Sequence, residues 1–327
     1  MFASLVVLAL IAVKPTAVVD AERLYVADAD GTVRVWNRKT LEFDAAQTKK
    51  MNGDGLLAIA RDGETLWGFD GSRAFTWDPN GARWDLQKGK PPPMPCSAFA
   101  VVGGKPVGTC GPGVHRFTDG KYWDAPEFND QVKGRGFGEA PHAIAASGNV
   151  LAIGTGFGEW GGHLWLLDVS TGKWSKFYDS LGNAVGIAKT EKGWVVAWSM
   201  SHMMAHARLR LHDDAAKEVV AGAELRDRYV RTLTFDSESK AVVGLEQQDL
   251  VKVTEKLGLE KVQSAVGQVK YGPERNAVGV SPGIGSFIAL GGGRYVIVGT
   301  SGPPLVVGGG KSVSLVAPSE SKPDAGK

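Results

Sequence analysis

The chain has 327 residues, of which 43% are hydrophobic and 22% charged, so it can bury a core of ordinary size. Its net charge of +2 excludes an electrostatic argument for nucleic-acid binding. The 44 glycines and 16 prolines stay below the proportion typical of low-complexity disorder. Because the glycines separate short apolar runs, the composition indicates a folded protein with many tight turns.

The chain begins with the pattern of an export signal. Leu5 to Val13 is an apolar stretch of nine residues, too short to cross a bilayer but of the length found in signal-peptide cores. Val19 and Ala21 are small residues at the −3 and −1 positions of a cleavage site. We predict a signal peptide over residues 1–21 and a secreted or periplasmic mature protein with no membrane span. The alternative is a buried strand at the start of a cytosolic domain.

The first repeat unit follows the predicted cleavage site. From Leu24, the sequence LYVADADGTVRVWNRKTLEFDA predicts three short strands and lacks the first strand of the units that come later. Propellers commonly close their ring by completing one blade with strands from both ends of the chain, which leaves no free edge. We therefore expect closure by the C-terminus: if GQVKYGPERNAVGV opens the last blade, the segment SVSLVA, which ends at Ala317, is free to supply the missing strand.

Three clear repeat units come next. They begin at Leu56, Ser97 and Ala143, at spacings of 41 and 46 residues, and each starts with an apolar strand rich in small residues. The segments Gly81–Asp85 and Gly120–Asp124 both read Gly-x-x-Trp-Asp and occupy the same place in the first two units. Four antiparallel strands with tight connections form one propeller blade, so the repeat predicts an all-β propeller.

Weaker units complete the repeat. They begin at Ala184 and Arg231, and a final stretch ends at Ala317. The register is not fixed between Val262 and Ser286, where the segment GQVKYGPERNAVGV either opens the last blade or is an insertion. The length indicates about seven blades of four strands over residues 22–318, with six or eight as alternatives. Residues 319–327 form a polar tail that we expect to be disordered.

The repeats resemble known propeller families. The segment DGTVRVWN, at Asp30–Asn37, looks like the third strand of a WD40 blade, and the units from Leu56, Ser97 and Ala143 resemble bacterial two-component-regulator propeller repeats. The chain does not repeat the Gly-His dipeptide and the Trp-Asp ending that recur regularly in WD40 blades. The resemblance therefore implies a fold, and a scaffold that binds proteins, peptides or small ligands, but it transfers no functional residue.

The two cysteines lie on neighbouring predicted strands. A two-residue turn at Gly103-Gly104 would bring Cys96 and Cys110 within one residue of direct opposition, which a small bulge accommodates. In an oxidising compartment they could form a disulfide. The alternative is a pair of buried thiols.

Three long predicted loops are the candidate binding site. Ala125–His142 joins two blades, whereas Gly156–His163 and Ser199–His206 join second to third strands of consecutive blades. All three belong to one face of a propeller, and long loops on a rigid scaffold are where function concentrates. The alternative is that they are tolerated insertions. The predicted ligand- or partner-binding residues are Arg135, Phe137, Glu139, His142, Trp160, His163, His202, Met204 and His206.

Other motifs carry little chemistry. The run from His202 to His206 contains two histidines and two methionines, a combination suited to copper, but methionines also fill apolar gaps and we predict packing rather than a metal site. Gly156–Gly161 matches Gly-x-Gly-x-x-Gly, yet a strand rather than a helix follows it, which excludes a dinucleotide site. We find no catalytic motif and expect no cofactor.

The sequence therefore predicts an exported, non-catalytic and monomeric propeller that binds a protein or peptide partner, or a small-molecule ligand, on its loop-rich face. The alternative is an extracytoplasmic enzyme, a lyase or hydrolase, with a site in the central funnel.

Overall fold

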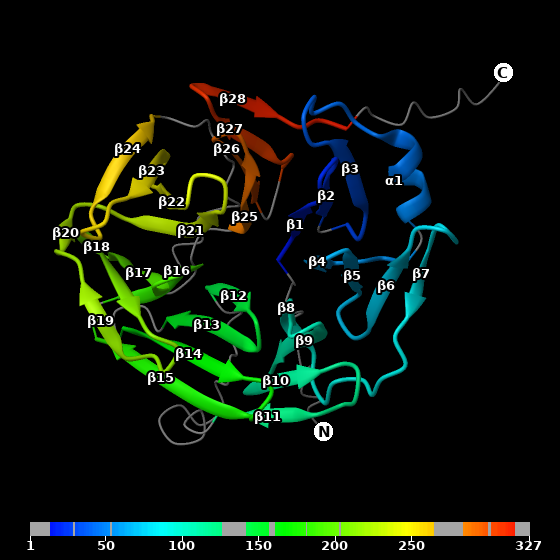
Figure 1. Ribbon diagram of the computed structural model, residues 1–327, viewed down its shortest axis with the longest axis horizontal. Coiled ribbons are helices and arrows are strands. Elements are labelled where there is room, and N and C mark those ends of the chain that lie inside the picture. Colours follow the sequence, from blue (N-terminus) through cyan, green and yellow to red (C-terminus); the bar gives the residue numbers. More distant parts are fainter. Residues whose placement is uncertain are drawn as a thin grey trace, which may run out of the picture.

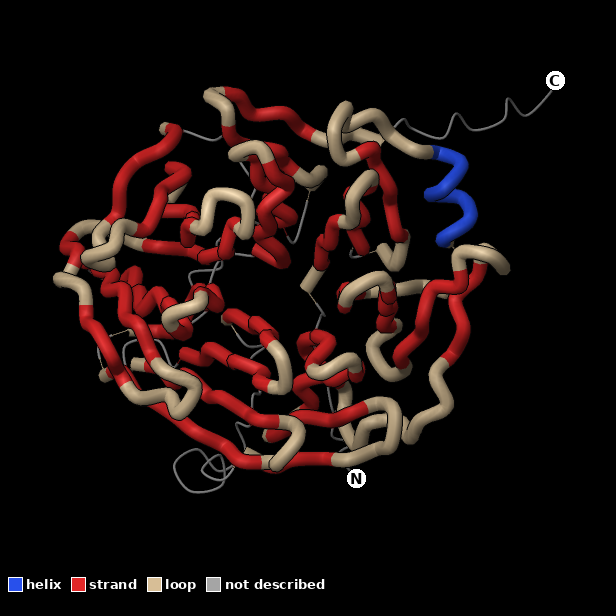
Figure 2. The backbone as a smooth tube through the Cα atoms, viewed as in Figure 1, coloured by secondary structure: helices blue, strands red, loops and turns tan. Residues whose placement is uncertain are grey.

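The computed structural model describes residues 14–28, 30–52, 54–125, 142–156, 161–180, 182–202, 204–264, 284–299 and 302–317. Seven antiparallel sheets stand around a central axis (Figure 1), and we name them blades 1 to 7 in chain order. The predicted all-β propeller is confirmed, with seven blades rather than six or eight. Figure 2 shows how little of the described chain is helical, and no described helix is long and apolar enough to cross a membrane.

Most blades have four strands, whereas blade 1 has three and blade 5 has a short fifth strand. Blade 1 contains β1 (Thr16–Val19), β2 (Arg23–Ala27) and β3 (Val33–Asn37). Blade 2 contains β4 (Ala58–Asp62), β5 (Thr65–Phe69), β6 (Ala74–Asp78) and β7 (Arg83–Leu86). Blade 3 contains β8 (Cys96–Val102), β9 (Lys105–Cys110), β10 (Gly113–Arg116) and β11 (Tyr122–Asp124). Blade 4 contains β12 (Ala143–Ser147), β13 (Val150–Gly156), β14 (Gly162–Asp168) and β15 (Lys173–Asp179). Blade 5 contains β16 (Asn183–Thr190), β17 (Gly193–His202), β18 (Met204–His212), β19 (Glu218–Ala221) and β20 (Leu225–Arg226). Blade 6 contains β21 (Val230–Asp236), β22 (Ala241–Glu246), β23 (Asp249–Val253) and β24 (Leu259–Gln263). Blade 7 contains β25 (Ile284–Gly291), β26 (Arg294–Gly299), β27 (Leu305–Gly308) and β28 (Lys311–Ser314).

The inner strands lie close together because their residues are small. A Cβ atom at Gly186 in β16 would lie 2.7 Å from the backbone nitrogen of Leu233 in β21, so a larger residue would push these two inner strands apart. Bulky residues instead fill the wider space between the outer parts of neighbouring blades. Trp123 and Trp165, for example, pack in one cluster between blades 3 and 4, which agrees with a structural role for most tryptophans.

The ring closes differently from the expected exchange of strands. The C-terminal strand β28 pairs with β27 inside blade 7, and the innermost strand of blade 1 is β1, which pairs with β2. The expectation for the segment SVSLVA was therefore wrong, because blade 7 already uses it as its fourth strand. The strand β1 lies within residues 1–21, the segment in which the sequence predicts an export signal.

The outer part of blade 1 also departs from the repeat. Only one isolated bridge, between Trp36 and Phe43, occupies the place of a fourth strand. The chain then forms helix α1 (Ala45–Met51), whose first turn is capped by the Asp44 side chain accepting from the Gln47 backbone nitrogen. Helix α1 therefore replaces an edge strand on the outside of the ring.

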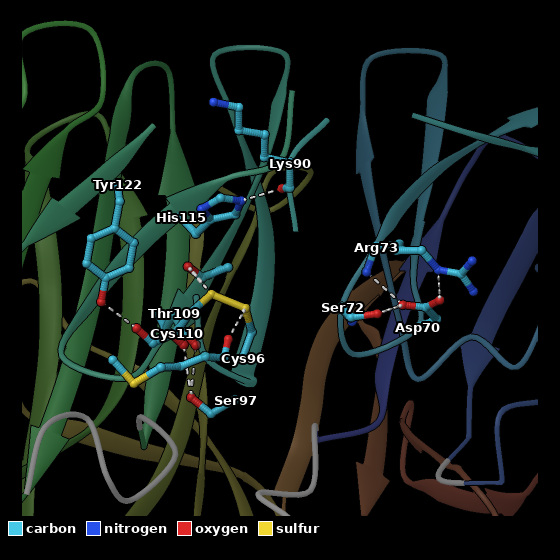
Figure 3. Close-up of a disulfide and its surroundings, with 12 residues drawn as sticks. Asp70, Ser72, Arg73, Lys90, Cys96, Ser97, Thr109, Cys110, His115 and Tyr122 are labelled. Atoms are coloured by element: carbon cyan, nitrogen blue, oxygen red, sulfur yellow. Dashed lines mark hydrogen bonds and ion pairs between the residues drawn. A yellow bond between two sulfur atoms is a disulfide. The ribbon is translucent and has the colours of Figure 1, made fainter. Parts of the chain in front are cut away.

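The two cysteines form a disulfide between β8 and β9 in blade 3 (Figure 3). Their register places Cys96 opposite Cys110, with an irregularity between Cys96 and Ala98, where the sequence predicted a bulge. Both side chains are buried. The Tyr122 hydroxyl donates to the Cys110 carbonyl oxygen at 2.8 Å, so the bridge belongs to a fully packed part of the blade.

Candidate functional site

The hairpin of β17 and β18 in blade 5 is built from the longest strands of the described chain, with ten and nine residues. It ends on the face where second strands connect to third strands. Near this end β20 pairs with β18, placing Arg226 opposite His206 and Leu225 opposite Ala207. The short strand β20, the fifth strand of blade 5, therefore widens the blade at the end of the hairpin.

A row of basic residues follows β18. His206, Arg208, Arg210 and His212 alternate with Ala207, Leu209 and Leu211, so they share one face of the strand. In the register of the hairpin, Trp198 lies opposite Arg208 and Trp194 opposite His212. Both tryptophans pack in a cluster with residues of blade 4, so the basic row faces blade 4.

Arg210 is the centre of a buried ionic network between these two blades. Its Nη2 lies 2.8 Å from the Asp179 Oδ2 at the end of β15, and its Nη1 contacts the Glu218 Oε2 on β19. The Arg210 and Asp179 side chains are only 13% and 4% exposed. The guanidinium also lies over the ring of Phe177, 5.3 Å from its centroid. The network thus joins blade 4 to blade 5 through a buried pair, Arg210 with Asp179, and a more exposed carboxylate, Glu218.

A small hollow opens above this network. It is lined by Asp179, Gly182, Trp198, His206, Arg208 and Glu224. Its volume of about 10 Å³ is room for one water molecule. Arg208 and Glu224 form its more exposed side, with a 3.9 Å ion pair. Trp198, one of the lining residues, has a buried indole N–H for which the described part of the chain provides no hydrogen-bond partner.

At the end of the basic row farther from the hairpin tip, His212 is neutral. Burial lowers its pKa to about 4, and the charge of Arg210 acts in the same direction. Its Nδ1 lies 3.3 Å from the Ala216 carbonyl oxygen, and its ring packs 4.6 Å from that of Phe177. It therefore packs as an uncharged aromatic group at neutral pH.

His142 lies apart from the hollow, at the start of β12. Its carbonyl oxygen accepts from Lys14 Nζ at 3.5 Å, so Lys14, two residues before β1, reaches from blade 1 to blade 4. Burial, followed by the charge of Lys14, lowers the pKa of His142 to about 4. Burial also lowers the pKa of Lys14 to about 8. His142 is thus an uncharged group at neutral pH.

The other predicted site residues are spread over several places. His163 packs beside Trp165 and Tyr178, with ring centroids 5.2 and 5.0 Å away. The backbone of His202 pairs with that of Met204 at the end of the hairpin. Of the predicted residues whose side chains the structure describes, His206 lines the hollow, whereas His142 and His163 do not. Four predicted residues lie outside the described residues: Arg135, Phe137, Glu139 and Trp160.

Several residues of this site were missed from the sequence. Arg208 and Arg210 were passed over, although the alternation of basic and apolar residues in HARLRLH is the signal that would have found them. Asp179 and Glu224 could not be assigned, because their partners are on other strands. Within the described ranges, no group of three histidine, cysteine, aspartate or glutamate side chains is close enough to hold a metal ion.

Comparisons with known proteins identify the fold and nothing finer. No family model and no curated protein matches the chain. A solved chain of the mitotic checkpoint complex matches with 10% identity and a TM-score of 0.55, covering 89% of this chain and 84% of that one. The structure of U3-55K matches with 15% identity and a TM-score of 0.53, covering 87% and 88%. The predicted resemblance to WD40-like propellers is therefore confirmed at the level of the fold.

Proposed function

We propose that this propeller is an exported scaffold that binds a protein or peptide partner on the face where the β17–β18 hairpin ends. The observation that carries the proposal is the widened end of blade 5 beside the hollow. There His206, Arg208, Glu224 and Arg226 are accessible, while Asp179 and Arg210 hold the hairpin rigidly against blade 4. Polar groups held in place on a rigid scaffold suit recognition.

The size of the hollow favours a macromolecular partner over a metabolite. Small-molecule sites typically enclose about 300–1,000 Å³, whereas the hollow has a volume of about 10 Å³. It is suited to an ordered water, or to one polar group at the tip of a partner's side chain. Affinity would then come from the surrounding surface, as in protein interfaces that combine a polar rim with buried aromatic residues.

Export is the second part of the proposal. The buried disulfide between Cys96 and Cys110 supports it, because disulfides persist in oxidising compartments and are rare in the cytosol of mesophiles.

The proposal is tested by affinity capture with the full chain, immobilised through its C-terminus, from an extracytoplasmic extract of the source organism. The test variant carries Ala at His206, Arg208 and Arg226. The matched control carries Ala at Arg83 and Lys88, which are exposed cationic side chains of blade 2. We expect a protein that the wild type and the control retain and the test variant loses. Equal retention by all three would place the interface elsewhere and overturn the proposal.

A further inference from the structure

The strand β1 lies at the inner edge of blade 1, between blades 2 and 7 (Figure 1). It pairs with β2 along its whole length, from Thr16 opposite Ala27 to Val19 opposite Leu24. Residues 16–19 belong to the segment that the sequence pattern assigns to a removable export signal. Signal removal after Ala21 would therefore delete a strand of the ring.

Blade 2 makes specific hydrogen bonds to this strand. The backbone nitrogen of Ile59 donates to the Thr16 hydroxyl oxygen at 2.6 Å, and Arg61 Nη1 donates to the Val19 carbonyl oxygen at 2.9 Å. Without β1, the buried nitrogen of Ile59 would lose its partner, which is costly in a packed interior.

Blade 7 fits closely against the same segment. A Cβ atom at Gly285 in β25 would lie 2.2 Å from the Pro15 carbonyl oxygen, so the two backbones can approach this closely only because residue 285 is glycine. Ala17 is 5% exposed and packs in one cluster with Leu24 of blade 1 and Val296 of blade 7. The segment thus fills the junction at which the ring closes.

The turn after β1 is also integrated. The Asp20 carboxylate accepts from the backbone nitrogens of Glu22 at 2.8 Å and Arg23 at 2.6 Å, and from the Tyr25 hydroxyl at 2.7 Å. Arg38 Nη1 donates to the Asp20 carbonyl oxygen at 2.9 Å. The bond between Ala21 and Glu22, the predicted cleavage point, lies inside this turn. Cleavage there would separate Asp20 from the hydrogen-bond donors Glu22, Arg23 and Tyr25.

We propose that residues Pro15–Ala21 are a permanent part of the functional protein, and that any processing of the N-terminal apolar stretch hydrolyses a peptide bond before Pro15. Hydrolysis there adds water and leaves a new amine outside β1, so the ring keeps its innermost strand. Hydrolysis after Ala21 would leave blade 1 with two strands and open the contact between blades 7 and 1.

The first test compares two chains made without export, one beginning at Pro15 and one at Glu22, each after an initiator methionine. We expect the longer chain to unfold cooperatively. We expect the shorter chain to melt at least about 10 °C lower, since several kcal/mol correspond to a shift of that order, or to show no cooperative transition. Equal melting temperatures would overturn the proposal.

A matched pair of substitutions in the longer chain guards against a general effect of truncation. Ala17→Asp places a charge in the apolar cluster, whereas Ala21→Asp makes the same change at an exposed position. We expect only Ala17→Asp to lower the melting temperature, and equal effects would contradict a structural role for β1. N-terminal sequencing of the exported protein completes the test. A first residue at or before Pro15 supports the proposal, and a first residue at Glu22 overturns it.

Discussion

The junction between blades 7 and 1 and the junction between blades 4 and 5 solve the same packing problem with different chemistry. The first is mainly apolar, with Leu24, Trp36 and Val296 in one buried cluster. Arg38 there donates from Nε to the Leu290 carbonyl oxygen at 2.6 Å, and its ion pair with Glu238, at 3.4 Å, is partly exposed. The second junction contains the buried network of Arg210 with Asp179 and Glu218. The first therefore holds the ring by packing, and the second by charges that must stay paired.

This difference between the junctions bears on which of them better supports a partner-binding surface. Removing Arg38 leaves carbonyl oxygens and the Glu238 carboxylate, which is 57% exposed and therefore solvated, whereas removing Arg210 leaves the carboxylate of Asp179, which is only 4% exposed. Ionic networks of this kind contribute little net stability compared with apolar packing, but they fix geometry once formed. The rigid edge that they give to the β17–β18 hairpin is what the proposed interface needs.

The largest expected effect is that of Arg210→Ala. This change removes the Arg210 guanidinium from the buried Asp179 carboxylate, and breaking a buried pair typically costs about 3–5 kcal/mol. We expect a loss of this order in the free energy of unfolding, measured by urea denaturation. Arg83→Ala serves as the control, because its pair with Asp85 is exposed at 68% and 47% and contributes about 0–1 kcal/mol. Similar losses for the two variants would contradict the contrast between junctions.

A pH titration should reveal a second difference. The pKa of His212 is about 4 in the fold, lowered by burial from 6.5. Between these values the unfolded chain binds a proton that the folded chain does not, so stability is present above pH 6.5 and is lost as the pH falls towards 4. The loss at His212 is on the order of 3 kcal/mol.

His212→Asn is the matched variant for this titration, because asparagine is polar but does not titrate. We expect the free energy of unfolding of the variant to fall less steeply than that of the wild type between pH 6.5 and 4.5. Chemical denaturation at each pH measures this free energy. His142, whose pKa is also about 4, contributes in the same direction and leaves a residual slope in the variant. An unchanged slope would show that His212 is not neutral in the fold.

The smallest effect is expected at the junction of blades 7 and 1. Arg38→Ala removes the hydrogen bonds to the carbonyl oxygens of Leu290 and Asp20, and we expect a loss of about 1–3 kcal/mol. Arg38→Lys should recover only part of it, because a lysine cannot reproduce the planar fork of donors. If Arg38→Ala lowered the melting temperature more than Arg210→Ala did in parallel thermal melts, the assignment of packing to one junction and charge to the other would be reversed.

Much of the fold could be predicted from the sequence because a propeller repeats its own pattern. The starts at Leu56, Ser97 and Ala143 correspond to β4, β8 and β12 within a few residues, and the register of Cys96 with Cys110 followed from one turn. The closing strand was assigned to the wrong end of the chain. Thr16–Val19 reads equally well as the end of a signal peptide, and only contacts with residues far along the chain distinguish the two.

The candidate site was harder to predict for a related physical reason. Sequence patterns indicated the face and the β17–β18 hairpin, but loop length says nothing about which side chains meet. His163 and His206 occur in comparable loops, yet His163 packs beside Trp165 and only His206 lines the hollow. Asp179 and Arg210 meet across two blades, a contact that depends on how neighbouring sheets are packed rather than on local sequence.

The absence of strand exchange between the two ends of the described chain has a consequence for biosynthesis. Every described blade is built from consecutive residues, so each sheet can form once its own segment has been synthesised and has reached the compartment in which the protein folds. Arg38, however, waits for Leu290, which is 252 residues later. At synthesis rates of about 5–20 residues per second, blade 1 spends on the order of 10 s or more with one side uncovered. The nascent ring is therefore a row of finished sheets with an exposed apolar start, and this is the stage at which a chaperone would protect it most.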